Sequence, residues 1–484
     1  MNPNPESRRN PTWEELVALV AAQAAEIAAL KAEIAELKRR QGLNSSNSSK
    51  PPSSDGLGKP PRNNRTRSTR EPSGRPSGGQ KGHKGETLLQ VTVPDKVVDH
   101  LPPSCPGCGA AMTPAMTTGY RARQVFDLPE PAPRLVATEH RAHDCACGRC
   151  GALSRGAFPA GVNAPVQYGE RIAAVVVYLS HDQLLPEDRL AAAMADLFGV
   201  KLAAATIAHI SHRCAARLAQ VATVLRERVL SAPVKHLDET GFRIGGKTQW
   251  LHVASTALLT FYRTCHQRGA MLANVVGTVV HDHWKPYYTL PDVDHALCNA
   301  HHLRELKALI EIEKEEWARA MAQLLRRACH ATNLAAARER PLKALKPRLV
   351  ELIERRYDAI VAAGLAYHEA QPALGRAPAK GANPRGRAPR RTGHNLLLRL
   401  LLRKQDALRF LHDAAVPFTN NLAEGDLRMM KVKQKISGGF RSEHGASDFA
   451  TIRSVISTAK KHGWNVIQAL AQEPLTLISA LRSI

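Results

Sequence analysis

Residues 234–244 read VKHLDETGFRI, and together with the chain as far as residue 298 they decide the fold. The segment is followed by Gly245-Gly246, a pair suited to a two-residue hairpin that needs positive φ. TQWLHVAST and LLTFYRTC come next, and the alternation of the three segments predicts antiparallel strands. NVVGTVVHD is expected to form a further buried strand and DHALC a shorter one, so the region predicts a mixed sheet.

Helical periodicity surrounds this sheet. Residues 156–232 are rich in Ala and Leu and are predicted to be a helical DNA-binding element of the helix-turn-helix type or a linking subdomain. Residues 299–411 are predicted to be a helical insertion interrupted by a basic loop. We therefore expect a multidomain α+β protein whose core comprises residues 233–298 and 412–455, with a C-terminal helical tail over 456–484.

The first 43 residues carry an apolar seam in alternating steps of three and four, with polar Gln23 at one core position. This heptad pattern predicts a coiled coil and self-association, whereas the alternative is an amphipathic helix packed on its own domain. Residues 44–90 are rich in Asn, Ser, Pro, Gly and basic residues and are predicted to be a disordered basic linker. The seam consists of Trp13, Leu16, Val20, Ile27, Leu30, Ile34 and Leu37.

A compact zinc-binding module is predicted over residues 91–155, where five of the nine cysteines lie. Two Cys-x-x-Cys pairs each place two thiolates on a turn, which favours a metal over disulfides in a reducing compartment. Cys145 is an alternative to Cys147 as the fourth ligand, and His143 is a weaker candidate. The residues expected to bind one structural Zn²⁺ in a closed tetrahedral site are Cys105, Cys108, Cys147 and Cys150.

The formal net charge of the 484-residue chain is +24, which favours a polyanionic partner, with DNA or RNA as the first candidates. No apolar stretch approaches membrane-spanning length, and the N-terminus lacks the apolar core of a signal peptide. We therefore expect a cytoplasmic protein without a membrane partner.

Three acidic residues lie in separate, well-framed segments. Asp238 and Asp282 each close an apolar run, and Glu424 lies early in a basic helix. Two carboxylates on strand ends and one on a packed helix could hold the two divalent cations that phosphodiester chemistry uses. Each acid also has a purely structural alternative. Asp238 could cap the turn after its strand, Asp282 could be the N-cap of a helix near His283, and Asn421 with Glu424 fits a capping box.

Basic residues follow Glu424, and they are expected to hold DNA phosphates without reading bases. They are Arg428, Lys431, Lys433, Lys435 and, in the sequence GGFRS, Arg441.

Histidines and cysteines near the acids are weaker candidates. Cys298 and His301 have ligand-like spacing, but we interpret them as a core residue at a strand end and a residue at a helix start. His281 and His283 flank Asp282 and are expected to shape the site or to be exposed.

The order of these features resembles the zinc-finger DDE transposase family of bacterial insertion sequence 66. The resemblance covers nearly the whole chain and rests on the heptad helix, the linker NSSNSSKPPSSD, the CPGCG knuckle, the DETG segment and the closing TNNLAE helix. It implies an RNase H-like catalytic core in which Asp238, Asp282 and Glu424 are the DDE acids. The family usually has an Arg after the Glu, whereas this chain has Gly425-Asp426.

The resemblance implies a DNA transposase, associated with the bacterial nucleoid, that cleaves the ends of its element and joins them to target DNA. Two Mg²⁺ or Mn²⁺ ions would serve as cofactors, the coiled coil would pair protomers, and accessory proteins of the same element could take part. Two alternatives remain. One is a non-catalytic, zinc-containing DNA-binding regulatory protein, and the other is an RNase H-like nuclease that hydrolyses DNA without joining it.

Overall fold

The computed structural model describes residues 12–43, 47, short stretches between 90 and 162, and residues 164–270, 272–337, 345–372, 374 and 390–483. The chain forms two compact units. One comprises residues 1–69, 161–191 and 202–484, and the other comprises residues 70–160 and 192–201. Every helix in the described part of the chain is too short or too polar to span a lipid bilayer.

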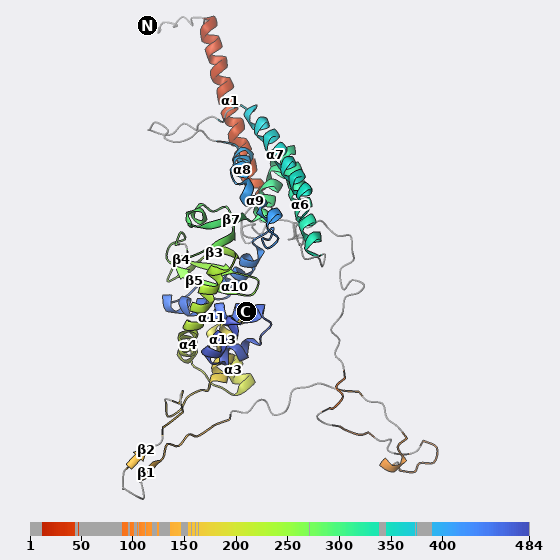
Figure 1. The fold of residues 1–484 in the computed structure, drawn as a ribbon, viewed down its shortest axis with the longest axis vertical. Helices are drawn as coiled ribbons and strands as arrows, with labels where there is room; N and C mark the ends of the chain where they lie inside the picture. The colour runs from red at the N-terminus through yellow and green to blue at the C-terminus, as the bar shows by residue number, and fades with distance from the viewer. Residues whose placement is uncertain are drawn as a thin grey trace, which may run out of the picture. The chain divides into compact units, whose positions relative to one another are not determined.

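A five-stranded mixed sheet lies in the larger unit, with the strand order β5-β4-β3-β6-β7 (Figure 1). β4 pairs antiparallel with β3 and β5, whereas β6 pairs parallel with β3 and β7. The predicted strands are confirmed. The predicted hairpin between β3 and β4 is confirmed as well, since Gly245 and Gly246 have φ values of 52° and 83°. The strands are β3 (Val234–Ile244), β4 (Lys247–Ser255), β5 (Thr260–Cys265), β6 (Gly277–His281) and β7 (Val293–Leu297).

β3 does not end at Asp238, so this residue does not close its strand, and the alternative in which it caps the turn after the strand is not observed. The antiparallel ladder with β4 continues past Asp238, which pairs with Val253, as far as Ile244. The parallel ladder with β6 is shorter and involves only residues 234–236 of β3. Asp238 therefore lies directly beyond the parallel ladder, where the two strands no longer hydrogen-bond.

Three helices pack around this sheet: α4 (Ala204–Ser231), α10 (Asn421–Ser437) and α11 (Glu443–Lys461). α10 packs on β3 and β4, and α11 packs on both β5 and α4. Phe242 and Tyr262 of the sheet share one apolar core with Leu427 of α10 and Phe449 of α11. The third acid is thus on a helix that packs against the strand of the first, and α11 continues through the predicted domain boundary after residue 455.

Residues 161–191 and 202–232 belong to the same compact unit as the sheet, so the predicted helical subdomain over 156–232 does not form a unit of its own. One buried ion pair shows the attachment: Asp182 accepts a hydrogen bond of 2.8 Å from Arg453 of α11. Three elements precede α4 in the chain: α2 (Glu170–Val177), the π-helix η3 (Tyr178–Asp182) and α3 (Glu187–Phe198). Two helices follow α11: α12 (Val466–Ala471) and α13 (Pro474–Arg482).

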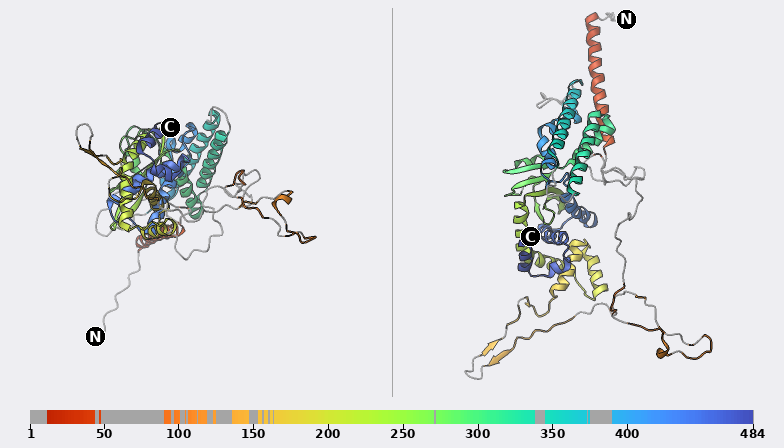
Figure 2. Two further views of the ribbon diagram at one scale, coloured as in Figure 1. Left: turned by 90° about the horizontal axis from the view of Figure 1, so that it is seen from below. Right: turned by 45° about the vertical axis from the view of Figure 1, so that its right-hand side comes forward.

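The chain between the sheet and α10 is helical, as predicted. α6 and α7 lie side by side (Figure 2). Their apolar faces share a core with β6 and β7. α9 returns to the sheet and packs on β7. Most of the predicted basic loop over 372–392 lies outside the described residues. The elements are α5 (Asn299–Ala308), the π-helix η5 (Leu309–Glu313), α6 (Glu316–Ala337), α7 (Pro347–Glu369), α8 (Thr392–Leu402) and α9 (Lys404–His412).

The predicted coiled-coil segment forms one continuous helix, α1 (Trp13–Gly42). Thr12 and Glu15 form a capping box at its start, which satisfies amide groups that have no partner within the helix. The seam side chains are exposed, with values such as 64% for Val20 and 51% for Ile27. The alternative in which this seam packs on its own domain is therefore not observed. Apart from Asn47 and Gln90, the predicted linker over 44–90 lies outside the described residues.

The smaller unit contains two hairpin-like pairings near the predicted zinc knuckles. Ser104 and Ala111 form an isolated antiparallel bridge, and β1 (Asp144–Ala146) pairs antiparallel with β2 (Leu153–Arg155). A short 3-10 helix, η2, spans Pro114–Met116. Cys108 is exposed, whereas Cys105, Cys147 and Cys150 lie outside the described residues.

Candidate active site

Three neighbouring strands bring ligand-type side chains to one edge of the sheet. Because β3, β6 and β7 run parallel, the carboxyl ends of β6 and β7 and the end of the parallel ladder on β3 meet at the same edge. His236 of β3 pairs with Val280 of β6, and continuing this register by two residues places Asp238 beside Asp282. Cys298 follows β7 and donates its amide to the carbonyl oxygen of His281, 2.9 Å away. The edge therefore presents Asp238, Asp282 and Cys298 in that order.

The environment of Asp238 is strongly unfavourable to a bare carboxylate. Burial, assisted by the charges of Glu239, Asp282 and Glu424, raises its pKa to about 8. One hydrogen bond opposes this shift, since the Glu239 amide donates to Asp238 Oδ1 at 2.8 Å. The other two predicted acids thus act on the first one through space, although they lie far apart in the sequence.

Asp282 directly follows β6, as predicted, and shapes the turn that comes next. Its Oδ1 accepts a hydrogen bond of 2.9 Å from the Trp284 amide. The following 3-10 helix, η4 (Lys285–Thr289), has Trp284 as its N-cap, so the alternative in which Asp282 is the N-cap of a helix is not observed.

The two histidines beside Asp282 have different roles. His281 is fully buried, and burial lowers its pKa to about 3, so the ring is neutral. Its Nδ1 contacts the Asp282 carbonyl oxygen, and its Nε2 lies 3.0 Å from His295 Nδ1. His283 is half-buried and lines a pocket beside the acids. His281 therefore supports the turn that carries Asp282, and His283 contributes to the wall of the pocket.

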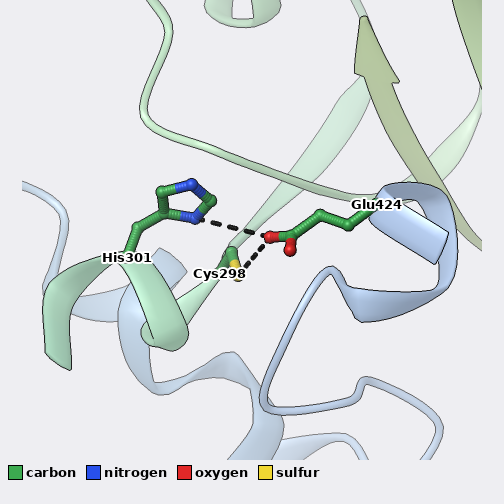
Figure 3. Close-up of side chains that lie close together, drawn as sticks. All are labelled: Cys298, His301 and Glu424. Carbon is green, nitrogen blue, oxygen red and sulfur yellow. Dashed lines mark hydrogen bonds and ion pairs between the residues drawn. The ribbon is translucent and has the colours of Figure 1, made fainter. Parts of the chain in front are cut away.

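Glu424 lies in the first turn of α10 and faces the start of α5 (Figure 3). Its Oε1 lies 3.9 Å from His301 Nδ1 and 4.0 Å from Cys298 Sγ. Its Oε2 lies 3.7 Å from the guanidinium of Arg304, a cation that the sequence analysis missed. Within the described residues, Cys298, His301 and Glu424 are the one group of three or more Cys, His, Asp or Glu side chains whose ligand atoms all lie within 4.8 Å of one another.

Asn420 places Glu424 at this edge, and the sequence analysis missed its role. It is 2% exposed, its Nδ2 donates to the Leu237 carbonyl oxygen at 2.8 Å, and its Oδ1 accepts from His236 Nδ1 at 2.8 Å. Its amide donates to Cys298 Sγ at 3.1 Å. Asn420 is also the N-cap of α10 and makes no side-chain cap, so the alternative of a capping box formed by Asn421 and Glu424 is not observed. The adjacent asparagines Asn420 and Asn421 were the sequence signal that could have pointed to this role.

Asp426, two residues after Glu424, ties the first turns of α10 to β4, β5 and α11. Its Oδ2 accepts hydrogen bonds from Ser255 Oγ at 2.5 Å, Thr260 Oγ1 at 3.1 Å and Lys461 Nζ at 2.9 Å. These donors belong to β4, the start of β5 and the end of α11. Asp426, which with Gly425 follows Glu424 where the family usually has an Arg, is therefore a structural anchor for the helix that carries Glu424.

Glu239 holds the loop after Asp282 against the strand of Asp238. Arg268 donates to Glu239 Oε1 at 2.7 and 2.9 Å, and the Tyr287 hydroxyl donates to Oε2. The Arg268 guanidinium also stacks over Trp284, 4.2 Å from the ring centroid. The sequence analysis missed this cluster because its members are distant in the chain, although the segment DETG points to Glu239.

The predicted phosphate-binding residues are not equivalent. Arg428, Lys431 and Lys435 are exposed on α10, and Arg441 is 96% exposed in the following loop. Lys433 instead places its amine over the rings of Phe440 and Phe449, at 4.9 and 5.5 Å, and burial lowers its pKa. Lys433 is therefore directed toward the core, and four of the five predicted cations are available to a phosphate backbone.

A pocket of about 210 Å³ lies beside Asp282. It is lined by Asp282, His283, Trp284, Leu297, Cys298, His301, His302, Glu305 and Arg399. Carboxylate, imidazole and thiol groups thus share a small polar cavity with an arginine, an environment that suits a cation or a phosphate oxygen.

Comparisons with known proteins identify the family of this chain. A family model described as "Transposase IS66 family" matches residues 165–448, which include Asp238, Asp282, Glu424 and the helices between them. A second model, a family of unknown function named DUF6444, matches residues 2–88. An uncharacterized protein, y4jO, from Sinorhizobium fredii is 39% identical over 77 residues, which are 15% of this chain and 24% of that protein. The chain thus spans about a quarter of that relative's length. Because the first match covers more than half of the sequence, the chain belongs to the IS66 transposase family.

Proposed function

We propose that this chain cleaves DNA at the ends of an insertion sequence and joins those ends to target DNA, with Asp238, Asp282 and Glu424 as the catalytic acids. Family membership makes it an enzyme that acts on DNA, and the cleavage and joining steps are our proposal. We also propose that the sheet with α10 and α11 is the RNase H-like core that the family resemblance implies.

The observation that carries this proposal is the perturbed carboxyl group of Asp238. Burial, together with the charges of Glu239, Asp282 and Glu424, raises the pKa of Asp238, so acids from β3, the end of β6 and α10 lie near one another. Burial of like charges is costly unless a counter-ion compensates them. Carboxyl groups kept close together at such a cost are typical of functional sites.

The donor set fits hard divalent cations. Asp238 and Asp282 offer carboxylate oxygens, which suit Mg²⁺ or Mn²⁺, and Glu424 could complete a second position. Two such ions would activate the attacking oxygen and stabilise the leaving one. The chain's own residues hold these acids in place, through Asn420 and Asp426 on α10 and through Glu239 on β3.

Exposed cations near Glu424 would position the DNA. Arg428, Lys431, Lys435 and Arg441 would contact phosphates, which fixes register without reading bases. We propose that α1 pairs two protomers through its exposed seam, since two element ends must be held together. The Cys₄ set of the smaller unit would bind a structural Zn²⁺, and proteins from the same element could assist on the nucleoid.

The test is divalent-metal-dependent nicking of DNA that carries the inverted repeats flanking the reading frame. Asp238→Ala should abolish nicking and joining while DNA binding persists, because the exposed cations are unchanged. Asp188→Ala, which removes an exposed acid on α3, is the matched control and should retain full activity. Nicking by Asp238→Ala in Mg²⁺ would contradict the assignment. Nicking without joined product in the wild type would indicate a nuclease, and binding without any nicking would indicate a regulatory protein.

A further inference from the structure

We propose that Cys298, His301 and Glu424 form a binding site for a borderline transition-metal ion, with Zn²⁺ as the best match. This site is separate from the Cys₄ module and from the pair formed by Asp238 and Asp282. It goes beyond the proposed function, with which it shares only Glu424.

The three ligands come together for simple geometric reasons. Cys298 is the N-cap of α5, and His301 lies in the first turn of the same helix, so the Cys-x-x-His spacing places both side chains near one point. Glu424 arrives from α10, which Asn420 ties to Cys298 through an N–H···S hydrogen bond of 3.1 Å. Figure 3 shows the carboxylate of Glu424 directed at both partners.

The distances are close to those of an occupied site. Zn–ligand bonds of about 2.0–2.3 Å in a tetrahedron put neighbouring ligand atoms about 3.4–3.6 Å apart. Here Glu424 Oε1 lies 3.9 Å from His301 Nδ1 and 4.0 Å from Cys298 Sγ. These two separations exceed the tetrahedral value by only a few tenths of an ångström, and all three ligand atoms lie within 4.8 Å of one another. A fourth position would stay open toward the pocket.

An independent observation indicates a missing partner. His301 Nδ1 is buried and has no hydrogen-bond partner among the described residues, although a buried ring nitrogen is costly to leave unpaired. The nitrogen is directed toward the cluster, since Glu424 Oε1 lies 3.9 Å away. A metal ion between the two groups would satisfy Nδ1.

The chemistry of the ligands selects the ion. A thiolate and an imidazole favour Zn²⁺ and similar ions over Mg²⁺, whose ligands are mainly oxygens. A thiolate and a carboxylate would together neutralise the two positive charges of the ion. Arg304 lies beside Oε2, 3.7 Å away, and leaves Oε1 to face the ligands. The consequence for the enzyme is that such an ion would compete with Mg²⁺ for Glu424.

The test counts metal ions on the full-length protein after Zn²⁺ is exchanged for Co²⁺, by equilibrium dialysis and metal analysis. Cys298→Ser and His301→Ala should each bind one Co²⁺ per chain fewer than the wild type. Cys214→Ser, which alters a buried cysteine on α4, is the matched control and should bind as many as the wild type. The predicted Cys₄ module contributes equally to all four proteins, so the difference isolates this site.

Equal Co²⁺ content in the wild type and in His301→Ala would overturn the inference. His301 is partly exposed, so this variant decides the matter even if Cys298→Ser unfolds, which thermal melting would reveal. Mg²⁺-dependent nicking by the wild type is measured in parallel. Absence of nicking with a cobalt difference would refute only the proposed function, and nicking without a cobalt difference would refute only this inference.

Discussion

Substitution of Asn420 by Ala tests how the fold places Glu424. The Asn420 side chain is 2% exposed and bridges α10 to β3 through two hydrogen bonds of 2.8 Å, to His236 and to the Leu237 carbonyl oxygen. Alanine removes both bonds and leaves a buried imidazole N–H and a buried carbonyl oxygen without partners. The first turn of α10, which carries Glu424, would lose its connection to the strand that carries Asp238.

The magnitude follows from these two orphaned groups. Each buried, unsatisfied polar group costs about 1–3 kcal/mol, so Asn420→Ala should lower the free energy of unfolding by about 2–6 kcal/mol. With a urea m-value of about 3 kcal/mol/M, the unfolding midpoint of the larger unit should fall by roughly 1 M. Displacement of Glu424 should also reduce nicking by about 100-fold, since a shift of about 1 Å in a catalytic group has an effect of that order.

Asn421→Ala is the matched control, because Asn421 is the adjacent residue of the same type and is exposed. Its unfolding free energy should change by less than about 0.5 kcal/mol. The two variants would be compared by urea unfolding followed by circular dichroism, and by nicking rate. Equal effects of the two substitutions, or a larger effect of Asn421→Ala as a capping box would require, would refute the reasoning.

Three further predictions concern Asp238, two glycines and α1. Because the pKa of Asp238 is raised from 3.8 to about 8, the melting temperature of the metal-free protein should fall as the pH rises from 4 to 8, and Mg²⁺ should restore it. Asp238→Asn should flatten this dependence of melting temperature on pH, and the same dependence in Asp238→Asn as in the wild type would contradict the prediction. Gly425→Ala, with open space around Cβ, should stabilise by about 0.5–1 kcal/mol in urea unfolding. Gly439→Ala should destabilise by about 1–3 kcal/mol, because Cβ would lie 2.5 Å from the Arg243 carbonyl oxygen; the opposite signs would disprove the packing argument. The double substitution Ile27→Asp with Leu30→Asp should dissociate the oligomer in analytical ultracentrifugation, whereas Glu26→Ala should not. An unchanged molecular mass of the double variant would exclude the seam of α1 as the interface between protomers.

Local sequence pattern was sufficient to predict the main helices and strands of this protein. The alternation in 234–265 and the Gly245-Gly246 pair predict the antiparallel strands, because strand period and turn geometry depend on neighbours in the chain. The helical periodicity of 299–411 and the heptad seam of α1 are local in the same sense. Asp238, Asp282 and Glu424 could be selected as candidate acids from their segments and from the family resemblance.

The connections between these segments depended on the tertiary structure. Nothing local shows that Asn420 rather than Asn421 is the buried N-cap residue of α10, that Asp426 reaches Ser255, or that Glu239 binds Arg268. Cys298 and His301 look like a strand-end residue and a helix-start residue until α10 brings Glu424 within 4.0 Å of both. The physical reason is that parallel register and helix packing unite residues far apart in the chain. Sequence by itself determined which side chains were available, and the tertiary structure decided which of them meet.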